Sequence, residues 1–238
     1  MLTNYDEFHD FFERSAILSG TEYHNDYMKT IRLFPDANWK DAFSRGQLRS
    51  KQWIVDTLLH LNKPLGTVYL CAGWYGTLSY MLFQSNISID RIRSFDLDES
   101  CWKIAERLNK KYVDQGWRFK ASTGDIHNIT YSNLYAGNRH FTTLRNNGTP
   151  VTTWDPGDPD TIINTSCEHI RNFHSWYENI PAGKLLILQS NNFFKIEDHV
   201  NCYNNIQEFI TDCPMSELQF ADELDCGEYR RFMIIGRK

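Results

Sequence analysis

The sequence predicts an α/β protein built on a doubly wound, mostly parallel sheet of seven strands, and two observations carry this prediction. From about residue 67 onward, short apolar segments alternate with helical stripes. Such alternation is typical of parallel strands joined by right-handed crossovers, which place helices on both faces of the sheet. The last two apolar segments are separated only by Asp222–Arg230, which is too short for a crossover helix. They are therefore expected to form an antiparallel hairpin at the sheet edge.

Length and composition fit one such domain with a small appendage. The chain has 238 residues, of which 41% are hydrophobic and 23% charged, and its net charge is -5. These values favour a folded domain and give no reason to expect nucleic acid as a partner. Apolar runs fall short of the roughly 18 residues of a membrane span, and the N-terminus lacks the order of a signal peptide. We expect a cytosolic protein without a membrane partner.

The six cysteines include no Cys-x-x-Cys pair. This pattern argues against a zinc knuckle and against a redox dithiol. Reduced thiols are expected, and no metal site is expected.

Residues 1–66 predict an N-terminal helical extension, and residues 67–238 are expected to form the sheet domain. The apolar positions of the extension recur with a period near 3.6, which is typical of helices that bury one face. Pro64–Gly66 then breaks the helical pattern. The positions on these stripes are Phe8, Phe11, Phe12, Trp53, Ile54, Thr57, Leu58 and Leu61.

The expected strands are short and apolar, and the expected helices between them carry apolar residues along one side. The strands are Thr67–Ala72, Ile92–Phe95, Trp117–Ala121, Thr161–Asn164, Leu185–Leu188, Glu217–Ala221 and Arg231–Ile235. The helices are Leu78–Phe83, Glu99–Tyr112, Phe173–Tyr177 and Ile206–Ile210.

A polar insertion, residues 128–160, interrupts the alternation. Asn147-Gly148 is a strong signal for a hairpin turn between His140–Leu144 and Val151–Trp154. Insertions at the open end of such a sheet often shape a binding site, but a surface loop without that role fits the sequence equally well. If the insertion covers the site, Trp154 is expected to line the pocket for the acceptor substrate.

In open α/β sheets, ligands bind beyond the carboxyl ends of the strands, so the residues that close each strand are the first candidates. Gly73 and Gly76 follow the first strand and allow a tight turn that a ligand can approach closely. Asp96 closes the second strand, twenty residues after Gly76, which is the separation at which an acid accepts the hydroxyls of a nucleoside ribose. Asp98 is predicted to cap the next helix.

The third strand is followed by a carboxylate and an apolar side chain that suit an adenine ring. Asp125 could accept from the exocyclic amine while Ile126 lies on the ring. Together with the glycine turn and the acid of the second strand, these residues indicate a ligand that carries adenosine.

Two bulky rings in this turn distinguish between the possible cofactors that carry adenosine. A dinucleotide fingerprint, Gly-x-Gly-x-x-Gly, needs bare backbone near the pyrophosphate. Here Cys71 takes the first position, and Trp74 and Tyr75 fill the gap before Gly76. NAD is therefore disfavoured, and the faces of the two rings could instead line the pocket of a sulfonium cation.

From Thr67 to Lys238 the order and spacing of these segments resemble the class I S-adenosylmethionine-dependent methyltransferases. Asp160–Ile170 looks like the strand and loop that read V-x-S-x-x-x-E-H-x in many members, and Ile180–Leu188 is similar to their Leu-x-Pro-Gly-Gly segment. The chain departs from the family at Tyr69, where an acid is usual, and at Cys71, where a glycine is usual.

This resemblance implies a Rossmann-like fold whose last strand lies antiparallel between strands five and six. It also implies S-adenosyl-L-methionine as the cofactor. The residues expected to bind it are Cys71, Ala72, Gly73, Trp74, Tyr75, Gly76, Asp96, Leu97, Gly124, Asp125, Ile126, Asn164 and Thr165.

Methyl transfer needs an aligned nucleophile and, for some acceptors, a base that removes a proton. Candidates for this base are Glu168 and His169 in the loop after strand four. Each also has a structural alternative, since His169 could simply pack there and an acid in the first turn of a helix is stabilising. Asn191 and Asn192, at the polar end of strand five, and Trp154 are expected to bind substrate.

The predicted function is methyl transfer from S-adenosylmethionine to a small molecule or a protein side chain. A noncatalytic S-adenosylmethionine-binding scaffold with the same fold remains an alternative, and so does an RNA methyltransferase. Asn164–Cys167 shows no Asp/Asn-Pro-Pro-aromatic tetrad, so methylation of base amino groups has no support. The acidic pI of about 5.9 does not favour salt-sensitive RNA binding.

Overall fold

The computed structural model describes residues 23–132, 140–144, 150–154 and 158–238. The expected helical stripe at Phe8–Phe12 lies outside these residues. No helix among the described residues is long and apolar enough to cross a membrane.

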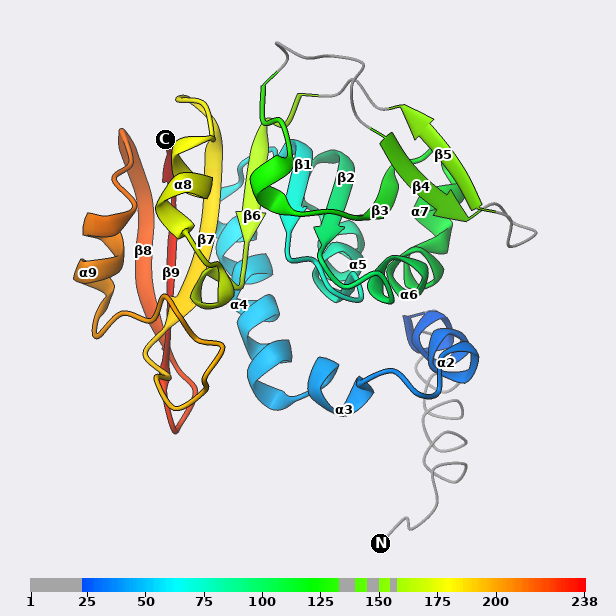
Figure 1. Cartoon of the computed structure of the whole chain (residues 1–238), viewed down its shortest axis with the longest axis horizontal. Helices are drawn as coiled ribbons and strands as arrows, with labels where there is room; N and C mark the ends of the chain where they lie inside the picture. Colours follow the sequence, from blue (N-terminus) through cyan, green and yellow to red (C-terminus); the bar gives the residue numbers. More distant parts are fainter. Residues whose placement is uncertain (1–22, 133–139, 145–149, 155–157) are drawn as a thin grey trace, which may run out of the picture.

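A seven-stranded sheet forms the centre of the molecule, in the order β3-β2-β1-β6-β7-β9-β8 (Figure 1). The first five strands in this order are parallel, and β9 is antiparallel to both β7 and β8. The predicted mixed sheet and terminal hairpin are thus confirmed, including the last strand between strands five and six. The strands are β1 (Gly66–Cys71), β2 (Ile89–Asp96), β3 (Phe119–Thr123), β6 (Thr161–Asn164), β7 (Leu185–Asn191), β8 (Glu217–Asp225) and β9 (Arg230–Arg237).

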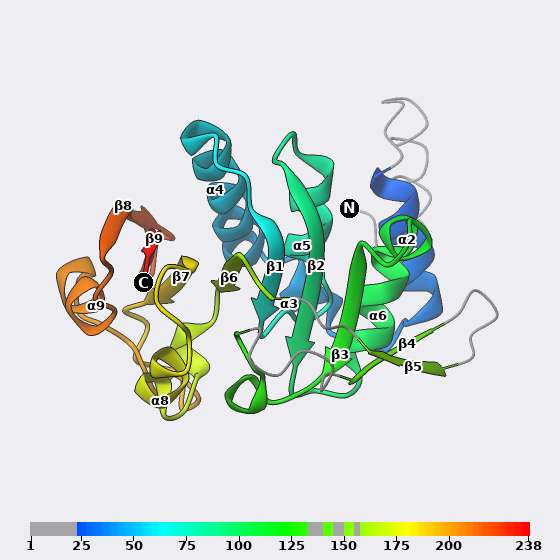
Figure 2. The ribbon, with the colours of Figure 1, turned by 90° about the horizontal axis from the view of Figure 1, so that it is seen from above.

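Helices cover both faces of the sheet, because successive side chains of each strand point to opposite sides. In β1, Val68 and Leu70 pack into one apolar core, while Tyr69 and Cys71 pack into the other. Figure 2 shows the first face covered by α4, α5 and α6, and α8 on the other. The helices are α4 (Arg45–Leu61), α5 (Thr77–Gln84), α6 (Cys101–Leu108), α7 (Lys110–Asp114), α8 (Phe173–Glu178) and α9 (Ile206–Asp212).

Two further helices, α2 (Tyr23–Leu33) and α3 (Trp39–Ala42), precede α4, and α2 packs against α6. A third apolar cluster fills this contact, in which Met28 and Trp39 meet Tyr75 and Ile104. The predicted helical character of the extension is confirmed for the part that the structure describes.

The helix expected over Glu99–Tyr112 is instead two helices, α6 and α7, which meet at Asn109. The Asn109 side chain is fully buried, and its Nδ2 donates to the carbonyls of Gly76 and Ala105 at 3.0 Å each. The third strand begins at Phe119 rather than at Trp117, because Trp117 has a φ of 63° that no strand residue adopts.

The insertion forms the expected antiparallel hairpin of β4 (His140–Leu144) and β5 (Pro150–Trp154). Its first strand, β4, lies beside β3 and α6. The turn predicted at Asn147-Gly148 lies outside the described residues, as does the side chain of Trp154.

Candidate functional site at the carboxyl ends of the strands

The turn after β1 is held tightly against its neighbours, and two glycines make this possible. A Cβ on Gly73 would lie 2.0 Å from the Ser94 Oγ atom, and a Cβ on Gly76 would lie 2.7 Å from Asn109 Nδ2. Gly76 also has a φ of 71°, while Ala72 and Trp74 reach 51° and 48° without being glycine. The main chain of this turn is therefore fixed by close packing, as a preformed ligand cradle requires.

The carboxylate of Asp96 closes β2 directly beside this turn. Its Oδ2 accepts from the backbone N–H of Trp74 at 2.8 Å, and its Oδ1 accepts from the N–H of Asp98 at 3.0 Å. Burial raises the pKa of Asp96, and these two N–H groups act in the opposite direction. Since a carboxylate offers about four acceptor positions, the group can still accept from a ligand hydroxyl.

The end of β3 is tied to the same place through the backbone, where Gly124 N–H donates to the Asp96 carbonyl at 2.8 Å. The Asp125 carboxylate accepts from His127 N–H at 2.9 Å and so caps a short 3-10 turn. The Ile126 side chain is buried in the core, whereas that of Leu97 is 73% exposed. We define the glycine-turn side as Cys71–Gly76, Asp96–Leu97 and Gly124–Ile126.

Two predicted cofactor residues have side chains that point into the core. Cys71 is fully buried with its sulfur 3.5 Å from the Tyr131 hydroxyl, and burial raises its pKa to about 12. Its main chain alone can reach a ligand. The Tyr75 ring packs at a centroid distance of 5.2 Å from Trp39, and its hydroxyl accepts from Asn38 N–H. Trp74 stacks on Tyr75 at 4.8 Å.

Asp98 does not occupy the capping position itself. Ser100 is the residue that precedes α6, and it makes no side-chain cap bond. The Asp98 carboxylate accepts from Ser100 N–H at 2.8 Å, and hydrogen bonds from Ser100 lower the pKa of Asp98. The predicted stabilising role next to this helix is therefore filled from two residues before the cap position.

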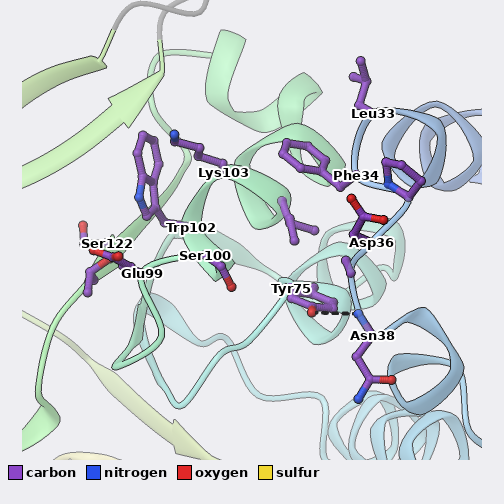
Figure 3. A pocket seen from close by; sticks show the side chains of 14 residues that line it. Leu33, Phe34, Asp36, Asn38, Tyr75, Glu99, Ser100, Trp102, Lys103 and Ser122 are labelled. Carbon is purple, nitrogen blue, oxygen red and sulfur yellow. Dashed lines mark hydrogen bonds between the residues drawn. The ribbon is translucent and has the colours of Figure 1, made fainter.

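A cavity of about 980 Å³ lies between the α2–α3 connection and the start of α6 (Figure 3). Phe34, Asp36, Tyr75 and Trp102 are among its walls. Of the residues predicted to bind the cofactor, Tyr75 lines it. Thr123, which pairs with Asp96 in the sheet, lines it as well, so the cavity reaches the carboxyl end of β3.

The loop after β6 begins with two residues predicted to touch the cofactor. Asn164 is fully buried, and its Oδ1 accepts from Ser166 N–H at 3.0 Å. Among the described residues its Nδ2 has no hydrogen-bond partner. The Thr165 carbonyl accepts from the guanidinium of Arg231 at 3.4 Å.

Glu168, a candidate base, is 2% exposed and forms a buried ion pair. Its Oε1 accepts from Arg231 Nη2 at 2.8 Å and from Asn191 Nδ2 at 2.7 Å. His169, the other candidate, is exposed, and its ring meets that of His199 edge to face at a centroid distance of 4.6 Å. The two adjacent candidates thus lie in very different surroundings.

The two asparagines predicted to bind substrate make structural contacts. Asn191 is buried, and besides its bond to Glu168 its Oδ1 accepts from Phe193 N–H at 2.8 Å. The Asn192 Oδ1 accepts from Arg230 N–H at 2.7 Å. The third predicted residue, Trp154, has its side chain outside the described part of the chain.

Two buried cationic side chains lie near Glu168, and neither is among the site residues predicted from the sequence. Lys51 on α4 is 8% exposed and Arg231 on β9 is 6% exposed. The Lys51 Nζ donates to Gln47 Oε1. Burial, followed by the charge of Arg231, lowers the pKa of Lys51 to about 7. We call Lys51, Glu168, Asn191 and Arg231 the buried polar cluster.

The position of α4 explains how Lys51 reaches this cluster. Ser50 Oγ donates to the Gln189 side chain on β7 at 2.7 Å, which anchors the helix to the sheet. In the sequence, Lys51 appears only as one member of a basic group with Arg45 and Arg49. The sequence signal that could have distinguished it is its spacing, because Lys51 lies three, four and seven residues before Ile54, Val55 and Leu58 on the buried stripe of α4.

No family model and no curated protein matches this sequence. Solved structures do match, and one of them is the small RNA methyltransferase HEN1, with a TM-score of 0.57 and 15% identity over 83% of this chain. The match covers 26% of the HEN1 chain, so this protein spans about a quarter of it.

Two other matches cover almost the whole length of both proteins. The N-methyltransferase NodS from Bradyrhizobium japonicum WM9, in complex with S-adenosyl-L-homocysteine, has a TM-score of 0.55 and 12% identity over 90% of this chain and 98% of NodS. Magnesium protoporphyrin IX methyltransferase (ChlM) from Synechocystis PCC 6803, with bound S-adenosylhomocysteine, has a TM-score of 0.53 and 12% identity over 99% of this chain and 100% of ChlM.

This chain has the class I methyltransferase fold. The matches extend through the sheet and its terminal hairpin, and the glycine-turn side lies at the carboxyl ends of β1, β2 and β3, where the resemblance in sequence expected the cofactor. At these identities the matches establish the fold.

Proposed function

We propose that the protein is an S-adenosylmethionine-dependent methyltransferase that acts on a small molecule or a protein side chain. The observation that carries this proposal is the Asp96 carboxylate, which lies at the end of β2 and is bonded to the glycine turn within a methyltransferase fold. A carboxylate at this point can accept the ribose hydroxyls of the cofactor. The NodS and ChlM structures that share the fold hold S-adenosylhomocysteine, the product of such a transfer.

In this proposal the adenosine lies over the glycine-turn side, and the methionine portion extends toward the loop after β6. Main-chain groups of Ala72 and Gly73, with the Trp74 ring, would border the ribose and the sulfonium. Asn164 and Thr165 would border the methionine portion. The Nδ2 of Asn164, which has no partner within the described part of the chain, supports this arrangement, because a buried amide donor without a partner is costly unless a ligand accepts from it.

Methyl transfer breaks the bond between sulfur and the methyl carbon and forms a bond from that carbon to the acceptor. The sulfonium leaves as a neutral thioether, so the protein mainly aligns the acceptor and takes up its proton. Glu168 is a poor choice of base, because the side chain is buried and its Oε1 is already bound by a guanidinium and an amide. His169 is the better candidate, since it is exposed and lies in the same loop.

Calorimetry tests the cofactor first. Wild-type protein is expected to bind S-adenosylmethionine and S-adenosylhomocysteine, and Asp96→Ala is expected to weaken both by about tenfold to a hundredfold, since it removes hydrogen bonds to a charged group. Asp90→Ala, an exposed acid on the same strand, is the matched control and should bind like wild type. Absence of binding by wild type would exclude the proposal.

Transfer is then tested with methyl-labelled cofactor against a panel of metabolites, peptides and RNA. Label in a metabolite or peptide supports the proposed acceptor class, and label in RNA would replace it with an RNA methyltransferase. Cofactor binding without any labelled product would favour a noncatalytic scaffold. A cytosolic location belongs to the same proposal, since all six cysteines are free.

A further inference from the structure

We propose that Glu168, His169 and His199 form a binding site for a divalent transition-metal ion. One carboxylate oxygen and one ring nitrogen from each histidine all lie within 4.8 Å of one another. Glu168 and His169 come from the loop after β6, and His199 comes from the segment that follows β7. The sequence pattern indicates no metal site, because thirty residues separate the two histidines.

The two oxygens of Glu168 have different roles in this site. Oε1 is held by Arg231 and Asn191, which fix the orientation of the carboxylate. Oε2 is buried and has no hydrogen-bond partner among the described residues. A buried carboxylate oxygen without a partner is costly, and coordination of a cation would satisfy it.

His199 is held in the tautomer that a metal ligand needs. Its Nδ1 lies 2.7 Å from the Phe193 carbonyl oxygen. Because a carbonyl can only accept, the proton resides on Nδ1 and the lone pair on Nε2, as in many metal sites where a backbone carbonyl fixes the ligating histidine.

The two segments that carry the ligands are fastened to each other through the main chain. The N–H groups of Val200 and Asn201 both donate to the Glu168 carbonyl, at 2.8 Å and 3.0 Å. The Asn201 side chain donates to the carbonyls of Cys167 and Ile170. These bonds hold His199 beside Glu168 before any ion arrives, so little ordering remains to oppose binding.

Two imidazoles and one carboxylate suit Zn²⁺, Mn²⁺, Fe²⁺ or Co²⁺ better than Mg²⁺ or Ca²⁺, which prefer oxygen ligands alone. Since His169 is exposed, further coordination positions face solvent. The positive charge of Arg231 on the other carboxylate oxygen opposes the ion, so we expect micromolar rather than nanomolar affinity.

An ion at this place would bear on methyl transfer. Bound to the nitrogen of His169, it would take the lone pair that a base needs and would itself lower the pKa of an acceptor oxygen. This role rests on the proposed function, whereas the metal site does not.

Titration with Co²⁺, followed by its visible absorption, together with equilibrium dialysis against Zn²⁺ and Mn²⁺, tests the site. Wild type is expected to bind about one ion per chain with a spectrum that shows nitrogen ligands. His169→Ala and His199→Ala should each weaken binding by at least about tenfold, the scale of losing one ligand. His60→Ala, an exposed histidine at the end of α4, is the control and should bind like wild type.

Histidine variants are preferred to changes at Glu168, because its ion pair with Arg231 could make such variants fail to fold. Circular dichroism and the melting temperature confirm that each variant folds. Metal binding that is unchanged in both His169→Ala and His199→Ala, or absent in wild type, would overturn the metal site. Calorimetry with S-adenosylhomocysteine on the same samples separates this failure from that of the proposed function, since its binding needs none of the three ligands.

Discussion

The glycine-turn side and the buried polar cluster lie at the carboxyl ends of the same sheet but are built in opposite ways. On the glycine-turn side, the charged groups are the carboxylates of Asp96 and Asp125, which accept from backbone N–H groups. In the buried polar cluster, side chains from α4, β7, β9 and the loop after β6 meet each other. One is made by the local path of the main chain, the other by tertiary contacts.

This difference has an energetic side. A carboxylate that accepts from backbone N–H groups is stabilised by dipoles that folding has already fixed. In a buried ion pair, the attraction between the charges must offset the hydration that both have lost. Replacing both residues together is therefore tolerated, whereas replacing one leaves an unpaired buried charge and lowers stability strongly. The two regions should therefore respond differently to substitution.

The largest effect is expected at Arg231. Arg231→Met leaves the Glu168 carboxylate buried without its cation, and the free energy of unfolding should fall by about 3–5 kcal/mol in urea denaturation. The double variant Glu168→Leu with Arg231→Met should recover most of this loss. Arg230→Met, next to it in sequence but exposed, should change stability by less than about 1 kcal/mol. A double variant as unstable as Arg231→Met alone would contradict the ion-pair argument.

The glycine turn should be the next most sensitive position. Gly76→Ala combines a left-handed backbone with a clash at Asn109, and we expect a loss of about 2–4 kcal/mol. Gly183→Ala is a matched control, because Gly183 has a φ of 85° but nothing within 4 Å of a new Cβ, so only about 1–2 kcal/mol should be lost. Equal losses would mean that packing of the turn is unimportant.

Replacing Lys51 should increase stability, whereas most substitutions of buried residues decrease it. Its pKa in the folded protein is about 7, below the ordinary value of 10.5, so the unfolded chain binds the extra proton and its contribution to stability rises as the pH goes from 7 to 10.5. Lys51→Met should raise the unfolding free energy by about 1–2 kcal/mol near pH 7 to 8, net of the hydrogen bond lost to Gln47. The gain should vanish above pH 10.5.

Chemical denaturation of wild type and Lys51→Met across this pH range measures the effect. Lys63→Met removes an exposed lysine and should give no pH-dependent difference. A destabilised Lys51→Met at pH 7 would mean that the ammonium group is well compensated within the buried polar cluster.

The smallest effect on stability is expected at Trp74. Trp74→Ala removes the stack on Tyr75 and should cost about 1 kcal/mol. If the ring faces the sulfonium, the same variant should weaken S-adenosylmethionine more than the uncharged S-adenosylhomocysteine, and Trp74→Phe should restore the preference. Calorimetry with both ligands measures this, and equal weakening would assign the ring to packing alone.

Much of the fold could be predicted from the sequence. The strand that ends at Cys71, the strand with Asp96 and the terminal hairpin all follow from short patterns of apolar residues and turns. The break at Asn109 could not be predicted, because the apolar stripe continues across it. The Asn109 side chain bonds to Gly76, which is distant in the sequence, and no local pattern announces this contact.

The candidate site divides in the same way. Asp96 and the glycine turn follow from local spacing. Asn191, expected to meet substrate, is instead bound to Glu168, and Tyr75 packs against Trp39 of the extension. The sequence carries no signal for either contact, since each depends on which distant segment packs against Asn191 or Tyr75 in the folded protein.

The sequence by itself determined the sheet, its hairpin and the acid beside the glycine turn, because hydrophobic period and turn chemistry act over a few neighbouring residues. The tertiary structure alone decided that Lys51, Glu168 and Arg231 share one buried place and that His199 reaches His169. The physical reason is that burial and charge pairing depend on distances in space. Lys51 and Arg231 are 180 positions apart in the sequence, so their distance is undetermined until the fold has formed.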